Sequence, residues 1–443
     1  MSHRKFIFDS YRFNSADGSL SLRYSYDDEL FFSEIIKFPV IGTLDSGATE
    51  ALDRIFKYLH IAAGVSYYKL FVPEEIELRS AKLDREQAEF FNVFYRNGLG
   101  EFSFRNNIVD LRERIRFPSG SESESFSRNS PILRGRTAIA LGGGKDSVVT
   151  LEIVRKHMNN LLLCSVGRAK SIDDIARISG LEYLAIERVI SPLLLDLNGK
   201  LRELGGYNGH VPISGIIAFI LLAAGVIYGF DRVLLSNERS ANVGNVDFGG
   251  SKVNHQWSKS FEFEKSFNSF VEKYIFSGFS YLSFLRPLSE IHIVKLFAAM
   301  EQYHGVFASC NGNFRLGGQT KRWCCHCPKC RFVFLMLAVY LSKKDLVSIF
   351  GENLLADEDQ LEGFRELCGI KNHKPFDCVG EIEESVYAIL HVSSHFRDDF
   401  IVRRLEEELG PVDSVLPGKK LFTPSPEHLL TRELQDVLNS ALC

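Results

Sequence analysis

The chain has 443 residues, more than one ordinary domain needs, which allows about two or three domains with sizeable cores. Hydrophobic residues make up 45% and charged residues 24% of it, and these proportions exclude disordered, collagen-like and coiled-coil chains. With 52 Lys and Arg residues against 56 Asp and Glu residues, the net charge is -4. No overall positive field therefore favours a nucleic acid as partner.

The amino-terminal region, residues 1–117, is predicted to form an α+β domain. Polar and apolar residues alternate over 5–13 and again up to Tyr26, with turn-forming residues at 14–18, so we expect two antiparallel strands. The first ten residues lack the long apolar run of a secretory signal. A cytoplasmic protein is therefore the expectation.

Helical patterns follow near 49–63 and 84–96, with a short apolar run at 67–72 between them. The polar, Ser-rich segment 118–131 predicts a linker that ends this domain.

Residues 132–345 change to strands that alternate with helices. The strands are predicted at 137–141, 161–166, 183–189 and 232–236, and the helices at 146–158, 171–179 and 213–228. Strands that are apolar on both faces and alternate with helices are typical of a buried parallel sheet. Residues 346–443 are predicted to be mostly helical, with an amphipathic segment near 381–409. The predicted fold class is therefore α/β.

The most apolar segment, residues 211–230, carries no charge and approaches the length of a membrane span. Pro212 suits a helix start and Gly229 a helix end, which leaves a helix of roughly 16 residues, about 24 Å long. A hydrocarbon core is ~30 Å thick, so we expect no membrane span.

A glycine-rich turn, Gly142-Gly143-Gly144-Lys145-Asp146-Ser147, stands where the first predicted parallel strand meets its helix. Three glycines allow a sharp turn that points several N–H groups into one concavity, and the helix amino terminus favours an anion. The turn predicts a phosphate or pyrophosphate site, with a tight turn that binds no ligand as the alternative.

This turn resembles the S-G-G-x-D-S loop of the PP-loop (pyrophosphatase-loop) adenylating enzymes, although glycine stands in place of the first serine. The resemblance implies a parallel-sheet core of the PP-loop type that binds ATP through all six residues of the turn. It also implies that a carboxylate of the substrate attacks the α-phosphate of ATP. Asp146 is then the expected Mg²⁺ ligand, because Mg²⁺ takes one or two carboxylates plus phosphate oxygens.

Nine cysteines are an odd number, and five of them crowd into residues 310–330, which favours a metal site in a reducing compartment over disulfides. Cys324, Cys327 and Cys330 have C-x-x-C-x-x-C spacing, and Cys310 precedes them by one loop. Four thiolates within tetrahedral reach form a structural Zn²⁺ site. A catalytic role for some of them and simple packing in a core are the alternatives. Cys325 and His326 lie inside the cluster and can replace one of the four ligands.

Two polar segments, 236–245 and 249–264, follow a predicted buried strand and lack amphipathic periodicity. The ligand crevice of a doubly wound sheet lies beyond the carboxyl ends of its strands, so these segments suit a polar, charged substrate. Solvated surface loops are the alternative. The predicted substrate-binding residues are Asn237, Arg239, Asn242, Gln256, Ser258 and Arg286.

Together these segments resemble one family, the MurL epimerases that act on UDP-N-acetylmuramoyl-L-alanyl-L-glutamate. The likeness spans most of residues 134–345 and rests on the glycine turn, Ser236-Asn-Glu-Arg-Ser-Ala, Asn254-His-Gln-Trp-Ser-Lys-Ser, Arg286-Pro-Leu-Ser-Glu, Ser309-Cys-Asn and Trp323 to Cys330. It implies ATP- and Mg²⁺-dependent inversion of the terminal L-glutamate, with AMP and pyrophosphate released. The implied partner is a small nucleotide-linked peptide. No oligomeric state is predicted.

Inversion requires removal of the glutamate α-proton, which is difficult beside a negatively charged carboxylate. In an acyl-adenylate the carbonyl delocalises the new charge, and fixed donors can stabilise it. The groups that move the proton need a pKa near the operating pH, and the candidates are His255, Lys259, Glu238, Cys310 and His326.

Two other functions stay open on sequence alone. One is a carboxylate-amidating enzyme that resembles 7-cyano-7-deazaguanine synthase, which shares an adenylating loop followed by a four-cysteine zinc site. The other is an RNA-modifying adenylating enzyme, which the acidic charge balance disfavours.

Overall fold

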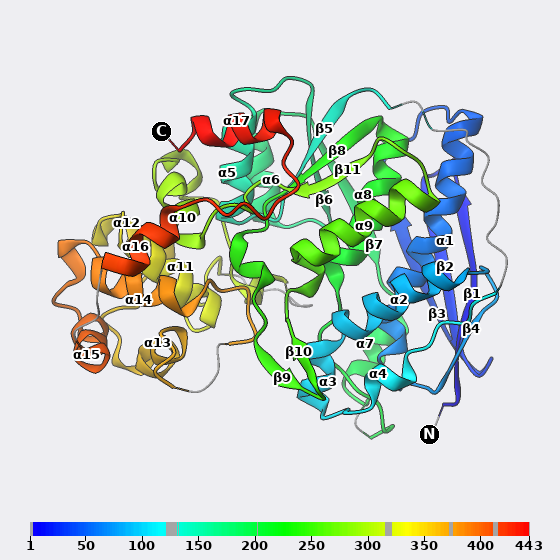
Figure 1. Cartoon of the computed structure of the whole chain (residues 1–443), viewed down its shortest axis with the longest axis horizontal. Helices are drawn as coiled ribbons and strands as arrows, with labels where there is room; N and C mark the ends of the chain where they lie inside the picture. Colours follow the sequence, from blue (N-terminus) through cyan, green and yellow to red (C-terminus); the bar gives the residue numbers. More distant parts are fainter. Residues whose placement is uncertain are drawn as a thin grey trace.

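A computed structural model of the chain describes residues 3–120, 131, 133–201, 203–314, 321–371, 375–410 and 415–442. Most of the predicted linker, 118–131, lies outside these residues. The helical carboxy-terminal region and the amino-terminal strands lie at opposite ends of the molecule, with the parallel strands between them (Figure 1).

One nine-stranded sheet organises the described residues, in the order β11-β8-β5-β6-β7-β3-β2-β1-β4. Its parallel half consists of β5 (Arg136–Ala140), β6 (Leu161–Val166), β7 (Tyr183–Val189), β8 (Phe230–Leu235) and β11 (Ser280–Ser283). The other half consists of β1 (Lys5–Asn14), β2 (Ser19–Tyr26), β3 (Leu30–Lys37) and β4 (Glu75–Leu78). A separate hairpin pairs β9 (Val246–Phe248) with β10 (Ser251–Val253). The fold class is α/β, as predicted, with a mostly parallel mixed sheet.

The two halves of the sheet join where β3 pairs antiparallel with β7, with Ile35 opposite Val189. Beside this junction the buried Glu34 carboxylate pairs with Arg188, whose Nε lies 2.7 Å from Glu34 Oε1. The amino-terminal strands and the parallel core therefore share one continuous sheet.

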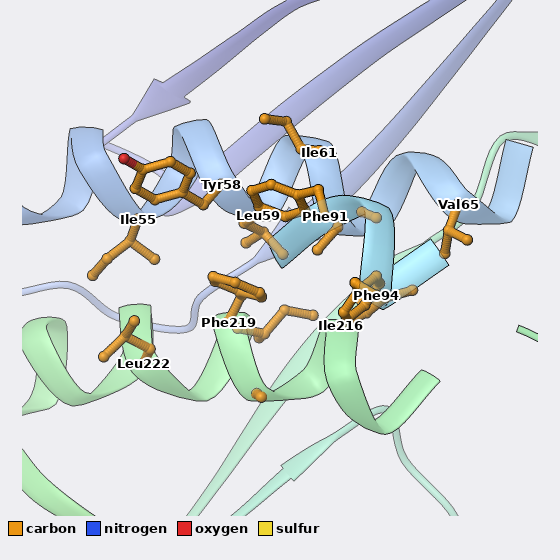
Figure 2. Close-up of a cluster of buried hydrophobic side chains, with 14 of the residues drawn as sticks. Ile55, Tyr58, Leu59, Ile61, Val65, Phe91, Phe94, Ile216, Phe219 and Leu222 are labelled. Carbon is orange, nitrogen blue, oxygen red and sulfur yellow. The ribbon is translucent and has the colours of Figure 1, made fainter. Parts of the chain in front are cut away.

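One face of the sheet is covered by α1 (Ser46–Tyr68), α2 (Arg85–Gly98), α8 (Ile213–Tyr228) and α9 (Phe261–Tyr274). Figure 2 shows Ile55 and Leu59 of α1 near Phe219 of α8, with Phe91 of α2 in the same cluster. This packing explains the apolar sequence of α8, because helices and sheet surround it with apolar side chains. No helix in the described part of the chain is both long and apolar enough to cross a bilayer.

The other face of the sheet carries α5 (Lys145–Val154), α6 (Lys170–Ser179), α10 (Glu290–Ala298) and α11 (Pro328–Ala338). Successive strand residues serve opposite faces: Val233 belongs to the first core and Leu234 to the second. Strands buried on both faces need apolar residues at every position, which is why the sequence of these strands lacks polar alternation.

The carboxy-terminal region is helical, as predicted. It contains α12 (Lys343–Phe350), α13 (Leu361–Leu367), α14 (Ile382–His391), α15 (Phe400–Leu409), α16 (Val415–Phe422) and α17 (Arg432–Ser440). The remaining helices are α3 (Gly100–Asn106), α4 (Leu111–Arg114) and α7 (Pro192–Asn198).

Two local predictions were wrong in their bounds. The helix predicted near 49–63 spans Ser46–Tyr68, so the apolar run 67–72 forms its end and the turn after it, because Tyr67 and Tyr68 pack into the core as helical residues. The helix predicted at 146–158 ends at Val154, before an exposed turn. The amphipathic segment 381–409 contains two helices, α14 and α15.

Candidate active site

The strand order creates a switch point in the parallel half of the sheet. β5 has β6 on one side and β8 on the other, and the chain packs α5 on one face of the sheet and α8 on the other. Doubly wound sheets bind their ligands beyond the carboxyl ends of the strands at such a point. The glycine turn follows β5 and the polar segment from Ser236 follows β8, so both lie there.

Two of the three glycines in the turn have room for backbone only. Gly143 has φ +80°, which L side chains rarely adopt, and a Cβ there would collide with the hydroxyl of Ser171. A Cβ on Gly144 would lie 2.7 Å from Ser309 Oγ. The Gly143 carbonyl accepts a 2.9 Å hydrogen bond from Ala308 N, which fixes the turn against the loop that leads to Cys310.

Charged side chains beneath the turn form a buried network. The ammonium of Lys145 is fully buried and pairs with the carboxylates of Asp146 and Glu290. Burial lowers the pKa of Lys145, but the two carboxylates outweigh this and hold that pKa above its ordinary value. Lys329 Nζ lies 3.7 Å from the second oxygen of Glu290. Asp146 keeps 21% of its side chain exposed, so the turn presents a carboxylate and not the lysine ammonium.

Arg286 has the largest fully buried side chain among the described residues, and both terminal nitrogens of its guanidinium are hydrogen-bonded within the protein. Its guanidinium donates to the Glu238 carbonyl at 3.0 Å and to Glu264 Oε2 at 3.1 Å. It therefore holds the segment after β8 against α9. A direct contact of Arg286 with substrate stays a prediction.

The other predicted substrate residues also lie around this segment. Asn237 donates to Ser283 Oγ at 2.9 Å, and Asn242 accepts from Phe261 N at 2.8 Å. Arg239 reaches the Thr423 carbonyl at 3.3 Å. Gln256 and Ser258 are buried.

A second group of residues completes the site around Cys378: it joins the predicted catalytic residues His255 and Lys259 to Cys378 and Glu101, which the sequence did not single out. Lys259 Nζ lies 3.2 Å from Cys378 Sγ, and Lys329 Nζ donates to the Cys378 carbonyl. The imidazole of His255 is hydrogen-bonded to both Cys378 and Glu101. No motif surrounds Cys378 or Glu101. Cys378 is more than 100 positions from Lys259, and Glu101 is more than 100 positions from His255. The sequence therefore carried no signal for either residue.

These contacts set the protonation states of the group. Burial raises the pKa of the Cys378 thiol, but Lys259 and the His255 hydrogen bond outweigh it and lower that pKa to about 6. Burial lowers the pKa of His255, but Cys378 and Glu101 outweigh it and raise that pKa to about 9. Burial and the neighbouring His255 lower the pKa of His210 to about 3. A thiolate beside a cationic imidazole and a cationic ammonium results.

The four predicted zinc ligands, Cys310, Cys324, Cys327 and Cys330, lie together with their sulfur atoms within 4.8 Å of one another. Cys330 Sγ lies 3.8 Å from Cys324 Sγ and 3.5 Å from Cys327 Sγ. A tetrahedral zinc with Zn–S bonds of about 2.3 Å separates its sulfurs by about 3.8 Å, so the cluster fits this metal. The same cluster contains Cys310, one of the predicted catalytic residues.

Cys325 and His326 lie outside this set of four. Cys325 Sγ donates to the Phe350 carbonyl at 3.4 Å, and burial raises its pKa to about 12. His326 is exposed and its Nδ1 lies 3.2 Å from Gln360 Nε2. The cluster also begins α11, because Cys327 caps its amino terminus and so places Lys329 against Glu290.

A cavity of about 890 Å³ opens beside the glycine turn, between α6 and the cysteine cluster. Ser171 and Ala308, which contact the turn, form part of its wall. Its cationic lining residues are Arg168, Lys170, Lys321 and Arg322, against the acidic Asp174 and Glu352. This lining suits a polyanionic ligand of nucleotide size.

Fold and site define an α/β protein in which a glycine turn, a buried charge network and a four-cysteine cluster meet beyond the parallel strands. Residues 1–284 match the family model of the MurL N-terminal domain, and residues 306–415 match that of the MurL C-terminal domain. The chain belongs to the MurL family.

Three relatives, each named UDP-N-acetyl-alpha-D-muramoyl-L-alanyl-L-glutamate epimerase, are similar over most of their length. One from Micromonospora sp. is 39% identical over 96% of this chain and 95% of its own. One from Xanthomonas oryzae pv. oryzae is 38% identical over 89% of this chain and 87% of its own. One from Salinispora tropica is 38% identical over 98% and 95%.

Proposed function

We propose that the protein inverts the terminal L-glutamate of UDP-N-acetylmuramoyl-L-alanyl-L-glutamate to D-glutamate, for peptidoglycan precursor synthesis. The proposed reaction consumes ATP, forms an acyl-adenylate on the glutamate, and releases AMP and pyrophosphate. Support comes from the names of the relatives and from the chemistry that the site offers.

The exposed face of the glycine turn carries this proposal. The Asp146 side chain is partly exposed there, with one of its oxygens paired to Lys145, whereas Lys145 itself is buried in an ion pair with Glu290. Backbone donors suit the pyrophosphate of ATP, and a carboxylate suits the Mg²⁺ that accompanies it. When bound, Mg²⁺ neutralises charge on the phosphate oxygens.

The surroundings of the turn suit the rest of the reaction. The cationic cavity beside it can take a nucleotide, and Lys259 interacts electrostatically with Asp146 and with Glu238. The network therefore connects the turn to the polar segments after β8. The four-cysteine cluster is assigned a structural Zn²⁺, which fixes the loop at Cys310 and the start of α11. Because ATP is consumed and no disulfide joins the described cysteines, a cytoplasmic location belongs to the proposal.

The test incubates the protein with the UDP-linked L-Ala-L-Glu substrate, ATP and Mg²⁺. Chiral analysis of the hydrolysed glutamate should show D-glutamate, with AMP and pyrophosphate formed only when the substrate is present. Hydroxylamine should trap the acyl-adenylate as a hydroxamate. Unchanged glutamate stereochemistry would reject the epimerase, and inversion without AMP would reject adenylation.

Asp146→Asn provides the variant for this test and Asp398→Asn its matched control. Asp398 is exposed and pairs with Arg403 of α15, away from the glycine turn and the cavity. We expect AMP release to fall at least about 100-fold in Asp146→Asn, as on removal of one electrostatic contact to a transition state. We expect Asp398→Asn to stay close to the wild type.

A further inference from the structure

The segment 375–378 enters the site from the carboxy-terminal part of the chain and is held there on two sides. The ring of Phe376 packs on Phe104 of α3, with ring centroids 5.2 Å apart. Asp377 accepts a hydrogen bond from Asn311, next to the cysteine cluster. Elements from two distant parts of the sequence therefore hold the residues next to Cys378 in place.

Cys378 is partly exposed and is surrounded by cations. Lys259 faces its sulfur from the short helix Trp257–Lys259, and His255 hydrogen-bonds it from the preceding loop. Lys329 of α11 interacts with it electrostatically. The acidic groups interact with these cations. Glu101 pairs with His255 and has His210 beside it. Asp146 and Glu238 interact electrostatically with Lys259. Asp377 precedes it in the chain and is paired with Asn311.

We propose, on the basis of the function proposed above, that Cys378 is the catalytic base that removes the α-proton of the activated glutamate. The Cα–H bond breaks, an S–H bond forms, and the electron pair of the broken bond enters the acyl carbonyl. A proton from water adds to the opposite face of Cα and completes the inversion. The thiol then returns its proton, by way of His255, to the hydroxide that the water left.

The other candidate bases are less suited to accept this proton. Lys259 is held in its cationic form beside Cys378, because the thiolate and the nearby carboxylates raise its pKa. His255 is likewise cationic near neutral pH and is engaged by Glu101. Cys310 belongs to the four-cysteine cluster, and the Glu238 carboxylate is buried and accepts from Ser240 Oγ at 3.2 Å. Cys378 alone among these candidates combines partial exposure, an unprotonated form and cationic neighbours that stabilise it.

The first experiment separates adenylation from proton removal. The zinc-loaded protein is incubated in D₂O with the UDP-linked substrate, ATP and Mg²⁺, and both hydroxamate formation and deuterium at the glutamate Cα are measured. Cys378→Ala and Cys378→Ser should lose at least about 100-fold in deuterium incorporation, the contribution typical of a general base. Their hydroxamate formation should stay within about 10-fold of the wild type, because adenylation does not use this thiol.

Cys368→Ala is the matched control. Cys368 is a second free thiol of the carboxy-terminal region, and burial raises its pKa to about 12, so it should exchange deuterium like the wild type. Wild-type exchange in Cys378→Ala would overturn the role of Cys378 and leave the proposed function intact. A wild-type protein that forms no hydroxamate would instead reject the adenylating function on which this inference rests.

The second experiment measures the protonation of the Cys378 thiol directly, first in the wild-type protein. The folded wild-type protein is treated with iodoacetamide at several pH values between 5 and 9. The rate at which Cys378 is alkylated is then measured by mass spectrometry of the peptide that contains it. We expect a rate midpoint at least about one pH unit below the ordinary thiol value of about 8.5. A midpoint at or above the ordinary value would overturn the proposal. Lys259→Met should move the midpoint upward, because it removes a cation 3.2 Å from the sulfur.

Discussion

The Glu34 carboxylate and the Arg188 guanidinium pair across the strands that join the two halves of the sheet, with both side chains largely buried. Two hydrogen bonds, of 2.7 and 3.0 Å, connect them, and Tyr67 donates a third to the same carboxylate at 2.9 Å. The pair therefore links the amino-terminal strands to the parallel strands, and each buried charge has a partner of opposite sign.

Removal of Glu34 should therefore destabilise the whole protein. Glu34→Ala leaves the Arg188 charge buried without a partner of opposite charge, and we expect the free energy of unfolding to fall by about 3 to 5 kcal/mol. Urea unfolding followed by circular dichroism measures it. Glu75→Ala is the control, since it breaks the exposed pair with Arg4 and should cost at most about 1 kcal/mol. Equal losses in the two variants would contradict this account.

The cysteine cluster should bind one zinc ion per chain. Cys327→Ser removes a ligand while the serine can still cap α11, so we expect zinc to be lost and the melting temperature to fall through loss of the metal. Elemental analysis of purified protein reports the metal. Cys325→Ser is the matched control, because Cys325 contacts the Phe350 carbonyl outside the cluster, and it should retain zinc. Zinc loss in both variants would mean that the assigned ligands are wrong.

The glycine turn permits a comparison of two glycines with similar backbone geometry. Gly143 and Gly180 have φ of +80° and +69°, but no atom lies within 4 Å of a Cβ on Gly180. Alanine at either position should cost about 1 to 2 kcal/mol of stability through backbone strain. Only Gly143→Ala should also weaken ATP binding in calorimetry, because its Cβ collides with Ser171 beside the turn. Unchanged affinity in Gly143→Ala would argue against this turn as the ATP site.

Stability should depend on pH through Glu384, whose pKa is raised to about 7 by burial and by the nearby Glu290 carboxylate. The folded protein binds this proton more tightly than the unfolded chain. The contribution of Glu384 to the free energy of unfolding is therefore fully present below about pH 4.5 and is lost as the pH rises through 7.

Between pH 5 and pH 8 we expect the unfolding free energy of the wild type, relative to Glu384→Gln, to fall by about 3 kcal/mol. Chemical unfolding at several pH values measures this difference. Glu383→Gln changes a partly exposed neighbour that pairs with Lys420 and should give a flat difference. A flat profile for Glu384→Gln as well would contradict the raised pKa.

The sequence by itself determined the elements and the local motifs. Period-2 alternation predicted β1 and β2, apolar runs predicted β5 to β8, and Pro212 and Gly229 marked the ends of α8 within one residue. The glycine turn, the C-x-x-C-x-x-C spacing and the family resemblance were equally readable. All of these depend on residues close together in the chain, where backbone geometry and side-chain periodicity are encoded locally.

Only the tertiary structure decided which distant residues share the site. It placed the Lys145 ammonium against Glu290, which lies 145 positions away. It also brought His255 to Glu101 across 154 positions, and Cys378 to Lys259 across 119 positions. It also selected Cys324 over its neighbour Cys325 as a cluster member. Such contacts follow from how sheet and helices pack, and no local pattern encodes them, because a single buried charge or thiol looks the same in sequence whatever it meets in the fold.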